Sequence, residues 1–280
     1  MGTQTNDPMP SVHRLASGEL MLAGYQGFRR LGTFKPVRML GGAQAIRQPW
    51  RSLYAHLITA VGWEQLETRF GELELVRWLA AQPRRTLDRM MADGINSPWA
   101  SSCGRLFDAA AAAIGLCRER ARFEAEGAMQ LEAAVDTTAL RAAGEDAAYL
   151  FSVADDPESG LPCIEPRPMW EALLEDLRAG TPTPVMAARF HRGLADVVVR
   201  MVIDRAHDCG DLGLRVDHVV LTGGCFQNAF LLEQVIDGLG NAGFSVLTHA
   251  RVPTNDGGLA LGQAAVAAAI RLDEKTGARL

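Results

Sequence analysis

Cysteine is scarce in this sequence, and no two cysteines are spaced as a metal-binding pair. The 280 residues include five cysteines, none of which forms a C-x-x-C pair: Cys103, Cys117, Cys163, Cys209 and Cys225. An odd number of cysteines without such a pair gives no sign of a disulfide framework or a zinc ribbon. The polar N-terminus, Met1–Pro10, lacks the basic-then-apolar pattern of a secretory signal. We therefore expect a protein of the reducing cytoplasm.

Long apolar runs and an excess of positive charge are also missing. The longest apolar run, Ala109–Cys117, is interrupted by Gly115 and falls far short of the roughly 20 residues that a membrane span needs. Lys and Arg number 28 against 33 Asp and Glu, which gives a formal net charge of −5. Nucleic-acid and anionic-membrane binding both favour a net basic face, so neither partner is expected. The hydrophobic share of 48% and charged share of 22% are ordinary for a globular chain and exclude disordered, collagen and coiled-coil classes.

Histidine pairs at helical spacing are absent as well. The six histidines are His13, His56, His191, His207, His218 and His249, and none forms an H-x-x-x-H pair. A metal site built on helical histidine spacing is therefore not predicted, and each histidine is interpreted as a structural or surface residue. Cys225 is interpreted as a small packing residue, because no base lies next to it in the sequence.

The first three quarters of the chain predict short strands followed by many helices. Strand-like runs punctuated by glycine cover Glu19–Leu40. Apolar residues then recur at helical spacing over Gln48–Ala143. Pro, Gly and Asp are frequent over Asp155–Pro168, which predicts a loop. Helices are expected from Met169 and over Val185–Ala206.

The last quarter has the clearest pattern. It predicts a buried strand over Val216–Thr222, a helix over Asn228–Leu239, a second strand over Phe244–Thr248 and a helix over Leu259–Ile270. This order of strand, turn and helix, given twice, is typical of an α/β lobe.

Two turns of this lobe are candidates for a binding site. Gly223 and Gly224 follow the first strand, and paired glycines let a phosphate or ribose approach the backbone beside a helix N-terminus. A plain tight turn fits the same residues equally well. Asp256 lies in the matching turn after the second strand, where it could cap the next helix or coordinate a metal beside a nucleotide. Capping is favoured for a lone Asp-Gly, but parallel strands place both turns at one edge of the sheet, where α/β proteins bind ligands.

A third candidate opens a helix expected over Ser102–Leu116. Ser101 or Ser102 can cap this helix, and Arg105 and Asp108 share a face at which they can pair. The residues fit a capped surface helix, or a site in which Asp108 binds a ribose hydroxyl.

Several segments, taken together and in order, resemble one family. They are Tyr25–Arg30, Arg47–Arg51, Asn96–Pro98, Ser101–Asp108, Ala188–Arg192, Gly223–Asn228 and Pro253–Gly262. The set resembles the C-terminal domain of HypF-type carbamoyltransferases, which mature NiFe hydrogenases and are similar to the TsaD family of tRNA-modifying carbamoyltransferases. The resemblance implies an α/β fold of the ASKHA (actin-like ATPase) class with a large helical region. It implies one TsaD-like domain over residues 1–280, with remnant N-terminal lobe strands in 15–47, a largely helical region in 48–206 and an α/β lobe in 207–280.

The resemblance also implies a reaction. A carbamoyl group would pass from carbamoyl-adenylate, made with ATP and magnesium, to the C-terminal cysteine of a HypE-like partner, toward the cyanide ligands of the NiFe site. The implied nucleotide-binding residues are Gly18, Glu19, Asp108, Gly223, Gly224 and Asn228. Asp256 is implied to be part of an incomplete metal site, and the family's further iron or zinc would lack its histidine ligands here.

Three departures from the family pattern leave other functions open. Met1–Thr3 is interpreted as a remnant of the Asp-Gly-Thr-Gly stretch that follows the family's His-rich metal motif, Ser17 replaces the first glycine of a phosphate loop, and Ala125-Glu126 replaces a Gly-Gln pair after Phe123-Glu124. Either a partner chain supplies the rest of the metal site, or the chain is a truncated or degenerate copy. It could act as a non-catalytic binding scaffold, or as an ASKHA carbamoyltransferase of another pathway.

Overall fold

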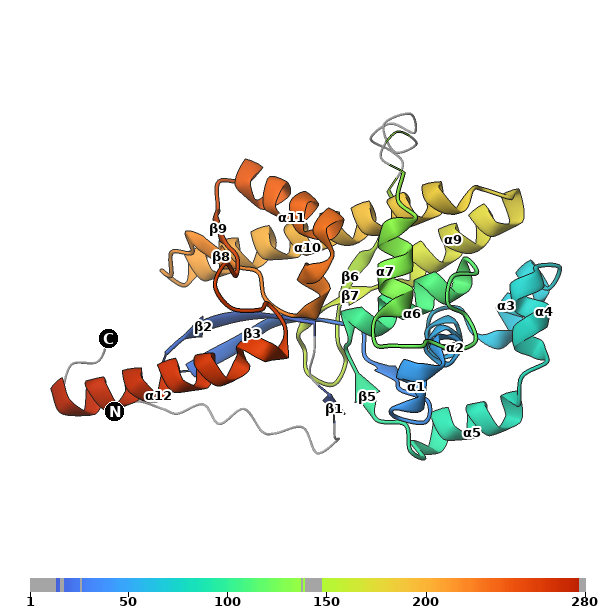
Figure 1. Cartoon of the computed structure of the whole chain (residues 1–280), viewed down its shortest axis with the longest axis horizontal. Coiled ribbons are helices and arrows are strands. Elements are labelled where there is room, and N and C mark those ends of the chain that lie inside the picture. The colour runs from blue at the N-terminus through green and yellow to red at the C-terminus, as the bar shows by residue number, and fades with distance from the viewer. Residues whose placement is uncertain (1–13, 16–17, 26, 137, 139–147, 277–280) are drawn as a thin grey trace.

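The computed structural model describes residues 14–15, 18–25, 27–136, 138 and 148–276 (Figure 1). The expected remnant at Met1–Thr3 and the departure at Ser17 lie outside these residues, as does part of the helical region expected to reach Ala143. Helices gather in one half of the molecule, and the C-terminal strands lie in the other half. The mixed α/β class expected from the sequence is confirmed.

A four-stranded sheet extends from the middle of the molecule into the half that holds the C-terminal strands (Figure 1). The hairpin of β2 (Glu19–Gly24) and β3 (Gly27–Phe34) is antiparallel, with a bulge at Leu20/Met21. Strand β3 pairs in parallel with β7 (Pro162–Glu165), and β7 pairs antiparallel with β6 (Ser152–Asp155). The expected loop over Asp155–Pro168 is therefore wrong, because it contains strand β7. Its longer pairing is with the neighbouring strand β6, and the Pro, Gly and Asp residues mark the turn between these two strands rather than a loop over the whole segment.

A smaller sheet joins the N-terminal segment to the helical half. In it β5 (Trp99–Ala100) lies between β1 (Arg14–Leu15) and β4 (Val37–Arg38). This sheet brings the start of the described chain beside the turn that precedes α6.

The helical half forms most of the hydrophobic core. Its helices are α1 (Gln44–Arg47), α2 (Pro49–Ala60), α3 (Trp63–Phe70), α4 (Glu74–Ala80), α5 (Arg84–Asp93), α6 (Cys103–Ala113), α7 (Glu126–Ala133) and α9 (Arg167–Ala179). The alanines Ala109–Ala113 of α6 are at most 1% exposed, and α6 packs against α2 and α7. Small side chains let these helices approach closely.

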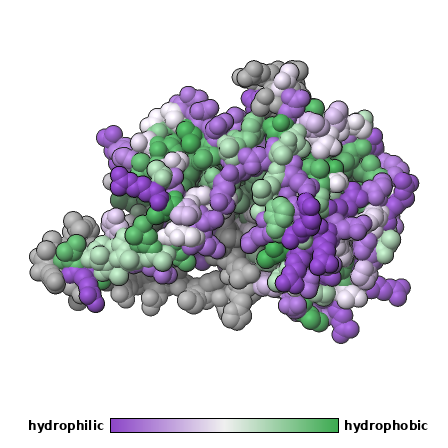
Figure 2. All heavy atoms as spheres, in the orientation of Figure 1, coloured by the Kyte–Doolittle hydropathy of each residue, from purple (hydrophilic) through white to green (hydrophobic). Residues whose placement is uncertain are grey.

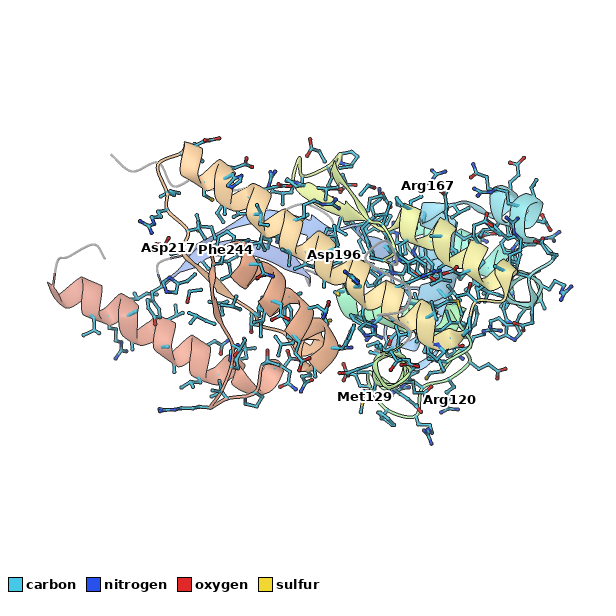
Figure 3. The ribbon with its side chains drawn as sticks, turned by 90° about the horizontal axis from the view of Figure 1, so that it is seen from above. Arg120, Met129, Arg167, Asp196, Asp217 and Phe244 are labelled. Carbon is cyan, nitrogen blue, oxygen red and sulfur yellow. The ribbon has the colours of Figure 1, made fainter. Side chains whose placement is uncertain are left out.

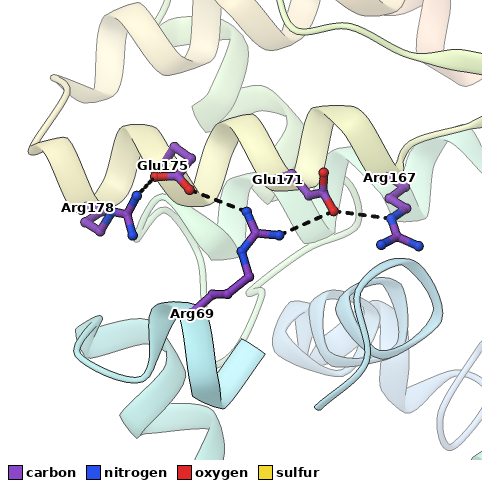
Figure 4. Close-up of polar contacts among 5 residues, drawn as sticks. All are labelled: Arg69, Arg167, Glu171, Glu175 and Arg178. Atoms are coloured by element: carbon purple, nitrogen blue, oxygen red, sulfur yellow. Dashed lines mark hydrogen bonds and ion pairs between the residues drawn. The ribbon is translucent and has the colours of Figure 1, made fainter. Parts of the chain in front are cut away.

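Ion pairs connect α3 to α9 (Figure 4). Arg69 places Nη1 3.6 Å from Oε1 of Glu171 and Nη2 3.6 Å from Oε1 of Glu175. Arg167 lies 3.2 Å from the same Glu171 oxygen, and Arg178 pairs with Glu175. These side chains are 32% to 50% exposed, and exposed pairs contribute about 0–1 kcal/mol each. The network therefore orients α9 more than it stabilises the fold.

The long helix α10 (Thr183–Asp211) connects the two halves. Figure 3 shows Asp196 near its middle, and burial raises the pKa of this carboxyl while Arg192 and Arg200 oppose the change. Beyond α10 the chain enters the C-terminal lobe. Asp217 and Phe244 lie side by side where its two strands begin, and the Ser245 amide donates to the Asp217 carbonyl over 2.9 Å.

The C-terminal lobe holds a parallel pair of strands with helices following each. Strand β8 (His218–Val220) pairs with β9 (Ser245–Leu247). A 3-10 turn, η2 (Gly224–Gln227), and helix α11 (Ala229–Asn241) follow β8, while η3 (Asp256–Gly258) and α12 (Leu259–Thr276) follow β9. The expected buried strand over Val216–Thr222 is wrong in part, because only Val219 of β8 is buried and its two neighbours are exposed.

None of the described helices combines the length and apolar character needed to span a lipid bilayer.

Candidate functional site

The two glycine turns of the C-terminal lobe are joined to each other. Gly223 has φ of +104°, a conformation that side chains disfavour, and its amide donates to the Thr254 carbonyl over 2.8 Å. In return the Thr254 hydroxyl donates to the Gly223 carbonyl over 3.4 Å. The turn after β8 and the turn after β9 therefore form one unit, as the parallel strands predict.

The first turn of α6 lies against this unit. The 3-10 turn η2 packs against α6, and its second residue is Cys225. Its sulfur lies 4.0 Å from the position that a Cβ on Gly104 would occupy. The three segments that the sequence analysis singled out thus meet at one place, although they are far apart along the chain.

Helix α6 begins with the expected cap. The Ser102 hydroxyl accepts a hydrogen bond from the Arg105 amide over 3.3 Å. Arg105 also reaches Asp108, with Nη1 and Oδ2 2.5 Å apart. Because the two side chains are only 13% and 4% exposed, this is a buried ion pair and the interpretation as a surface helix is wrong.

The protonation of Asp108 is finely balanced. Burial raises the pKa of its carboxyl to about 6, the positive charge of Arg105 opposes this change, and Glu124 adds a smaller increase. At pH 7 the carboxylate therefore predominates and can accept hydrogen bonds. Near pH 6 the group is half protonated.

Asn228 lies at the site, but its side chain is occupied. It is 8% exposed, its Oδ1 accepts from the Leu231 amide over 2.8 Å, and its Nδ2 lies 2.8 Å from Nε2 of His191. The amide thereby caps α11 and anchors it to α10. Its predicted contact with a nucleotide stays a prediction.

His191 is a structural residue that the sequence analysis did not place at the site. Its Nδ1 lies 2.8 Å from the Ala187 carbonyl. A carbonyl can only accept, so Nδ1 carries the proton and Nε2 accepts from Asn228. Burial lowers the pKa of His191 to about 4, so the ring is neutral at pH 7. Three aromatic rings surround it, those of Phe107, Phe190 and Phe230.

Gly18 and Glu19, at the start of β2, contact different parts of the protein. A Cβ on Gly18, whose φ is +75°, would come 2.7 Å from the Ser101 carbonyl, so this glycine packs directly beside the start of α6. Glu19 instead begins β2, where its Oε2 lies 3.0 Å from Nε of Arg30. The structure brings Gly18 to the site and holds the Glu19 carboxylate in an ion pair.

Asp256 is exposed on η3, and the cap expected from it is made by its neighbour. Oδ1 of Asn255 accepts from the Gly257 amide over 3.1 Å. No group of three or more histidine, cysteine, aspartate or glutamate side chains suited to a metal exists among the described residues. The described residues therefore do not fit a bound iron or zinc ion.

Two glutamates of α7 support the site. Glu126, one of the departures from the family pattern, is 3% exposed and accepts hydrogen bonds from the amide and guanidinium of Arg122, which lower its pKa. Glu132 accepts from the Ala229 amide over 2.7 Å at the start of α11. The position of Gly127 between them lets α7 pack beside Asp108, whose Oδ1 lies 3.5 Å from the place of a Cβ.

Comparison with known proteins places this arrangement in a family. The family model "Carbamoyltransferase, Kae1-like Domain, second subdomain" matches residues 17–263. The chain is 38% identical over 257 residues to the carbamoyltransferase HypF of Rhodobacter capsulatus, covering 90% of this chain and 30% of that protein. It is 33% identical to a carbamoyltransferase HypF homolog of Cupriavidus necator, covering 90% of this chain and 60% of the homolog.

Solved structures agree. The crystal structure of full-length HypF in the phosphate- and nucleotide-bound form matches with a TM-score of 0.76 and 26% identity over 91% of this chain and 31% of that one. The HypF of T. kodakarensis matches with a TM-score of 0.71 and 25% identity over 93% of this chain and 32% of that one. The chain thus spans about a third of the length of these solved relatives. It belongs to the HypF carbamoyltransferase family and corresponds to the second subdomain of the Kae1-like domain.

Proposed function

We propose that this chain binds the adenine nucleotide of a HypF-type carbamoyl transfer, at the junction of α6 with the two glycine turns. The observation that carries the proposal is the convergence of Gly18, the first turn of α6 and the Gly223–Gly224 turn on one place. A solved relative of the same fold is nucleotide- and phosphate-bound, which supports the same class of ligand here.

The residues have separate tasks in this proposal. The backbone of Gly223 and Gly224 gives a phosphate or ribose close access, because no side chain stands in the way. Asp108, ionised at pH 7, accepts from ribose hydroxyls once Arg105 yields part of its contact. Asn228 positions the turn by capping α11, while Gly18 leaves room beside α6. Magnesium would be bound mainly by the nucleotide phosphates, because Asp256 alone cannot hold a metal ion.

The proposed reaction is carbamoyl transfer during hydrogenase maturation. The thiolate of a C-terminal cysteine on a HypE-like partner attacks the carbamoyl carbon of carbamoyl-adenylate. A carbon–sulfur bond forms, the carbon–oxygen bond to AMP breaks, and AMP leaves with the electron pair. The protein's share of the work is to position both reactants and exclude water.

Titration calorimetry with ATP and magnesium tests the nucleotide site. We expect binding that Asp108→Asn weakens at least tenfold, with Asp93→Asn as a matched control on the exposed end of α5. Equal affinities of wild type and Asp108→Asn would contradict the assignment of Asp108. No binding to the wild type at millimolar ATP would favour the scaffold alternative.

A second assay tests the transfer. The chain, carbamoyl-adenylate and a peptide that ends in cysteine are mixed, and mass spectrometry follows carbamoylation of the peptide. A matched peptide that ends in serine should stay unmodified. Equal modification with and without the chain would contradict catalysis by this subdomain alone.

A further inference from the structure

A small cavity lies in the helical half, where β4, α2, β5 and α6 meet. Its lining includes Arg38 of β4, Ser52 and His56 of α2, Ala100 of β5 and Arg105 of α6. Its volume is about 10 Å³, which is room for one small occupant of the size of a water molecule or a monatomic ion. The proposed carbamoyl transfer gives this cavity no role.

Two of the lining side chains carry buried nitrogen atoms without hydrogen-bond partners. His56 is 6% exposed, and its Nδ1 has no partner among the described residues. The Nε of Arg38 is buried and lacks a partner in the same part of the chain. Buried polar groups in folded proteins are almost always hydrogen-bonded, and an unpaired one costs stability. These two nitrogen atoms therefore point to an occupant of the cavity that accepts hydrogen bonds.

The charge of Arg38 points the same way. Its Nη1 donates to the Ser97 carbonyl over 2.9 Å, and its Cζ lies 4.3 Å from the centroid of the Trp99 ring. Both of these partners are neutral, and no carboxylate of the described chain forms an ion pair with this guanidinium. Arg105 differs, because Asp108 already compensates its charge. The cavity thus has a net positive charge in its wall.

Donors also outnumber acceptors around the cavity. The guanidinium groups of Arg38 and Arg105 can only donate, and a neutral His56 ring donates when Nδ1 carries its proton. The Ser52 hydroxyl has only a long bond, 3.4 Å, to the Ala45 carbonyl and can turn its hydrogen toward an occupant instead. A water molecule would bring two hydrogens that need acceptors of their own, whereas a halide ion only accepts. Charge and hydrogen bonding both favour an anion.

We propose that this cavity binds a single chloride ion, held by the guanidinium groups of Arg38 and Arg105 and by Nδ1 of His56. The ion compensates the charge of Arg38 and gives both unpartnered nitrogen atoms an acceptor. It joins β4, α2 and α6, and it steadies Arg105, which pairs with Asp108. Because the ion binds without nucleotide, this proposal does not depend on the proposed function.

Bromide in crystals of the full chain tests the site directly. Crystals grown without chloride are soaked in sodium bromide, which takes the place of chloride and is located by its anomalous scattering. We expect an anomalous peak within hydrogen-bond distance of Arg38 and His56. A water molecule there without anomalous signal would overturn the proposal. Peaks at exposed side chains alone would mean an adventitious ion only, and would overturn it as well.

Thermal unfolding gives an independent readout in solution. The melting temperature is measured in sodium chloride and in sodium gluconate at equal ionic strength, since gluconate is too large for the cavity. A ligand that binds only the folded state raises the melting temperature. We expect it to be about 2–4 °C higher in chloride. Equal melting temperatures in the two salts would contradict chloride binding.

Variants of Arg38 connect both readouts to this cavity. Arg38→Gln removes the charge and should abolish the bromide peak and the chloride-dependent rise. Arg38→Lys keeps a positive charge without the Nε donor and should retain a smaller rise, which leaves a test if the glutamine variant does not fold. Arg85→Gln, at an exposed position of α5, is the matched control and should behave as the wild type. A rise as large in either Arg38 variant as in the wild type would show that the ion does not bind here.

Discussion

Both ends of the Asn228 side-chain amide are engaged inside the protein, one by the Leu231 amide and one by His191. The same residue type is common at helix starts, where its oxygen satisfies a backbone donor. The contact with His191 goes beyond this local role, since it joins α11 to α10. Asn228 therefore fixes the position of the turn that carries Gly223 and Gly224.

Replacing this residue should measurably weaken the fold. Asn228→Ala removes the cap, worth about 1 kcal/mol, and leaves a buried His191 nitrogen unpaired, which costs a further ~1–3 kcal/mol. We expect the free energy of unfolding in urea to fall by about 2–4 kcal/mol. Asn241→Ala, at the exposed far end of α11, is the control and should change it by less than ~0.5 kcal/mol. Equal effects of both variants would show that the buried Asn228 amide stabilises the fold no more than the exposed amide of Asn241 does.

Buried histidines should make the fold sensitive to acid. His56 is completely buried beside Trp170, and burial lowers its pKa to about 3. Between about pH 6.5 and 3 the unfolded chain holds a proton on His56 that the folded chain does not, so stability falls as the pH falls. His191 acts in the same direction down to about pH 4. Asp108, with its pKa raised to about 6, acts in the opposite direction and loses stability as the pH rises from about 4 to 6.

A single substitution isolates this effect. His56→Leu removes one titrating group, so the dependence of unfolding free energy on pH should become shallower by up to about 1.4 kcal/mol per pH unit between pH 6 and 4. Urea unfolding at several pH values measures the slope. His207→Gln, on an exposed position of α10, should keep the slope of the wild type. An unchanged slope in His56→Leu would mean that His56 takes up its proton equally in both states.

At the scale of elements, the start of α11 depends on α7. Glu132 places Oε1 2.7 Å from the Ala229 amide, and a carboxylate there complements the positive end of the helix dipole. The contact connects two helices that are distant in the sequence. It also supports the turn that precedes α11.

Neutralising this carboxylate should loosen the connection. Glu132→Gln keeps the shape of the side chain but removes its charge, and we expect a loss of about 1 kcal/mol in unfolding free energy at low salt. Added salt screens the charge, so the difference from wild type should shrink in 1 M sodium chloride. Glu233→Gln, an exposed change on α11, is the control. A loss that is the same at all salt concentrations would argue against the dipole contact.

Some elements of the fold are set by neighbouring residues and could be predicted from the sequence, whereas others depend on contacts that form only in the folded chain. The cap at Ser102 and the end of α9 at Gly180, which is left-handed, follow from local chemistry and were predictable. Strand β7 was missed although its antiparallel partner β6 is a neighbour in the sequence, because the Pro, Gly and Asp residues of the turn between them hide two short strands. The site followed the same rule. Its glycine turns were visible in the sequence, whereas the approach of η2 to the start of α6 depends on tertiary packing.

At the scale of the whole molecule, α12 stands out because one helix leaves many apolar side chains exposed. Figure 2 shows it as largely green at the left of the molecule. Its exposed large apolar residues are Leu259, Leu261, Val266, Ile270 and Leu272, each at least 40% exposed. Val220 on β8 and Leu247 on β9 are also exposed, at 59% and 47%. At 3.6 residues per turn, Leu259, Val266 and Ile270 share one face of α12. An exposed apolar helix face of this kind favours association between protein molecules.

We therefore expect the chain to self-associate as its concentration rises. The triple variant Leu259→Gln, Val266→Gln and Ile270→Gln should shift sedimentation velocity profiles toward monomer, because it removes apolar area from one face of α12 without altering the core. The matched control, Leu212→Gln with Leu214→Gln, changes exposed apolar residues just after α10 and should leave association unchanged. If the control reduces association as much as the triple variant does, the contact is spread over the surface. If neither variant changes it, the apolar face of α12 is not what brings the molecules together.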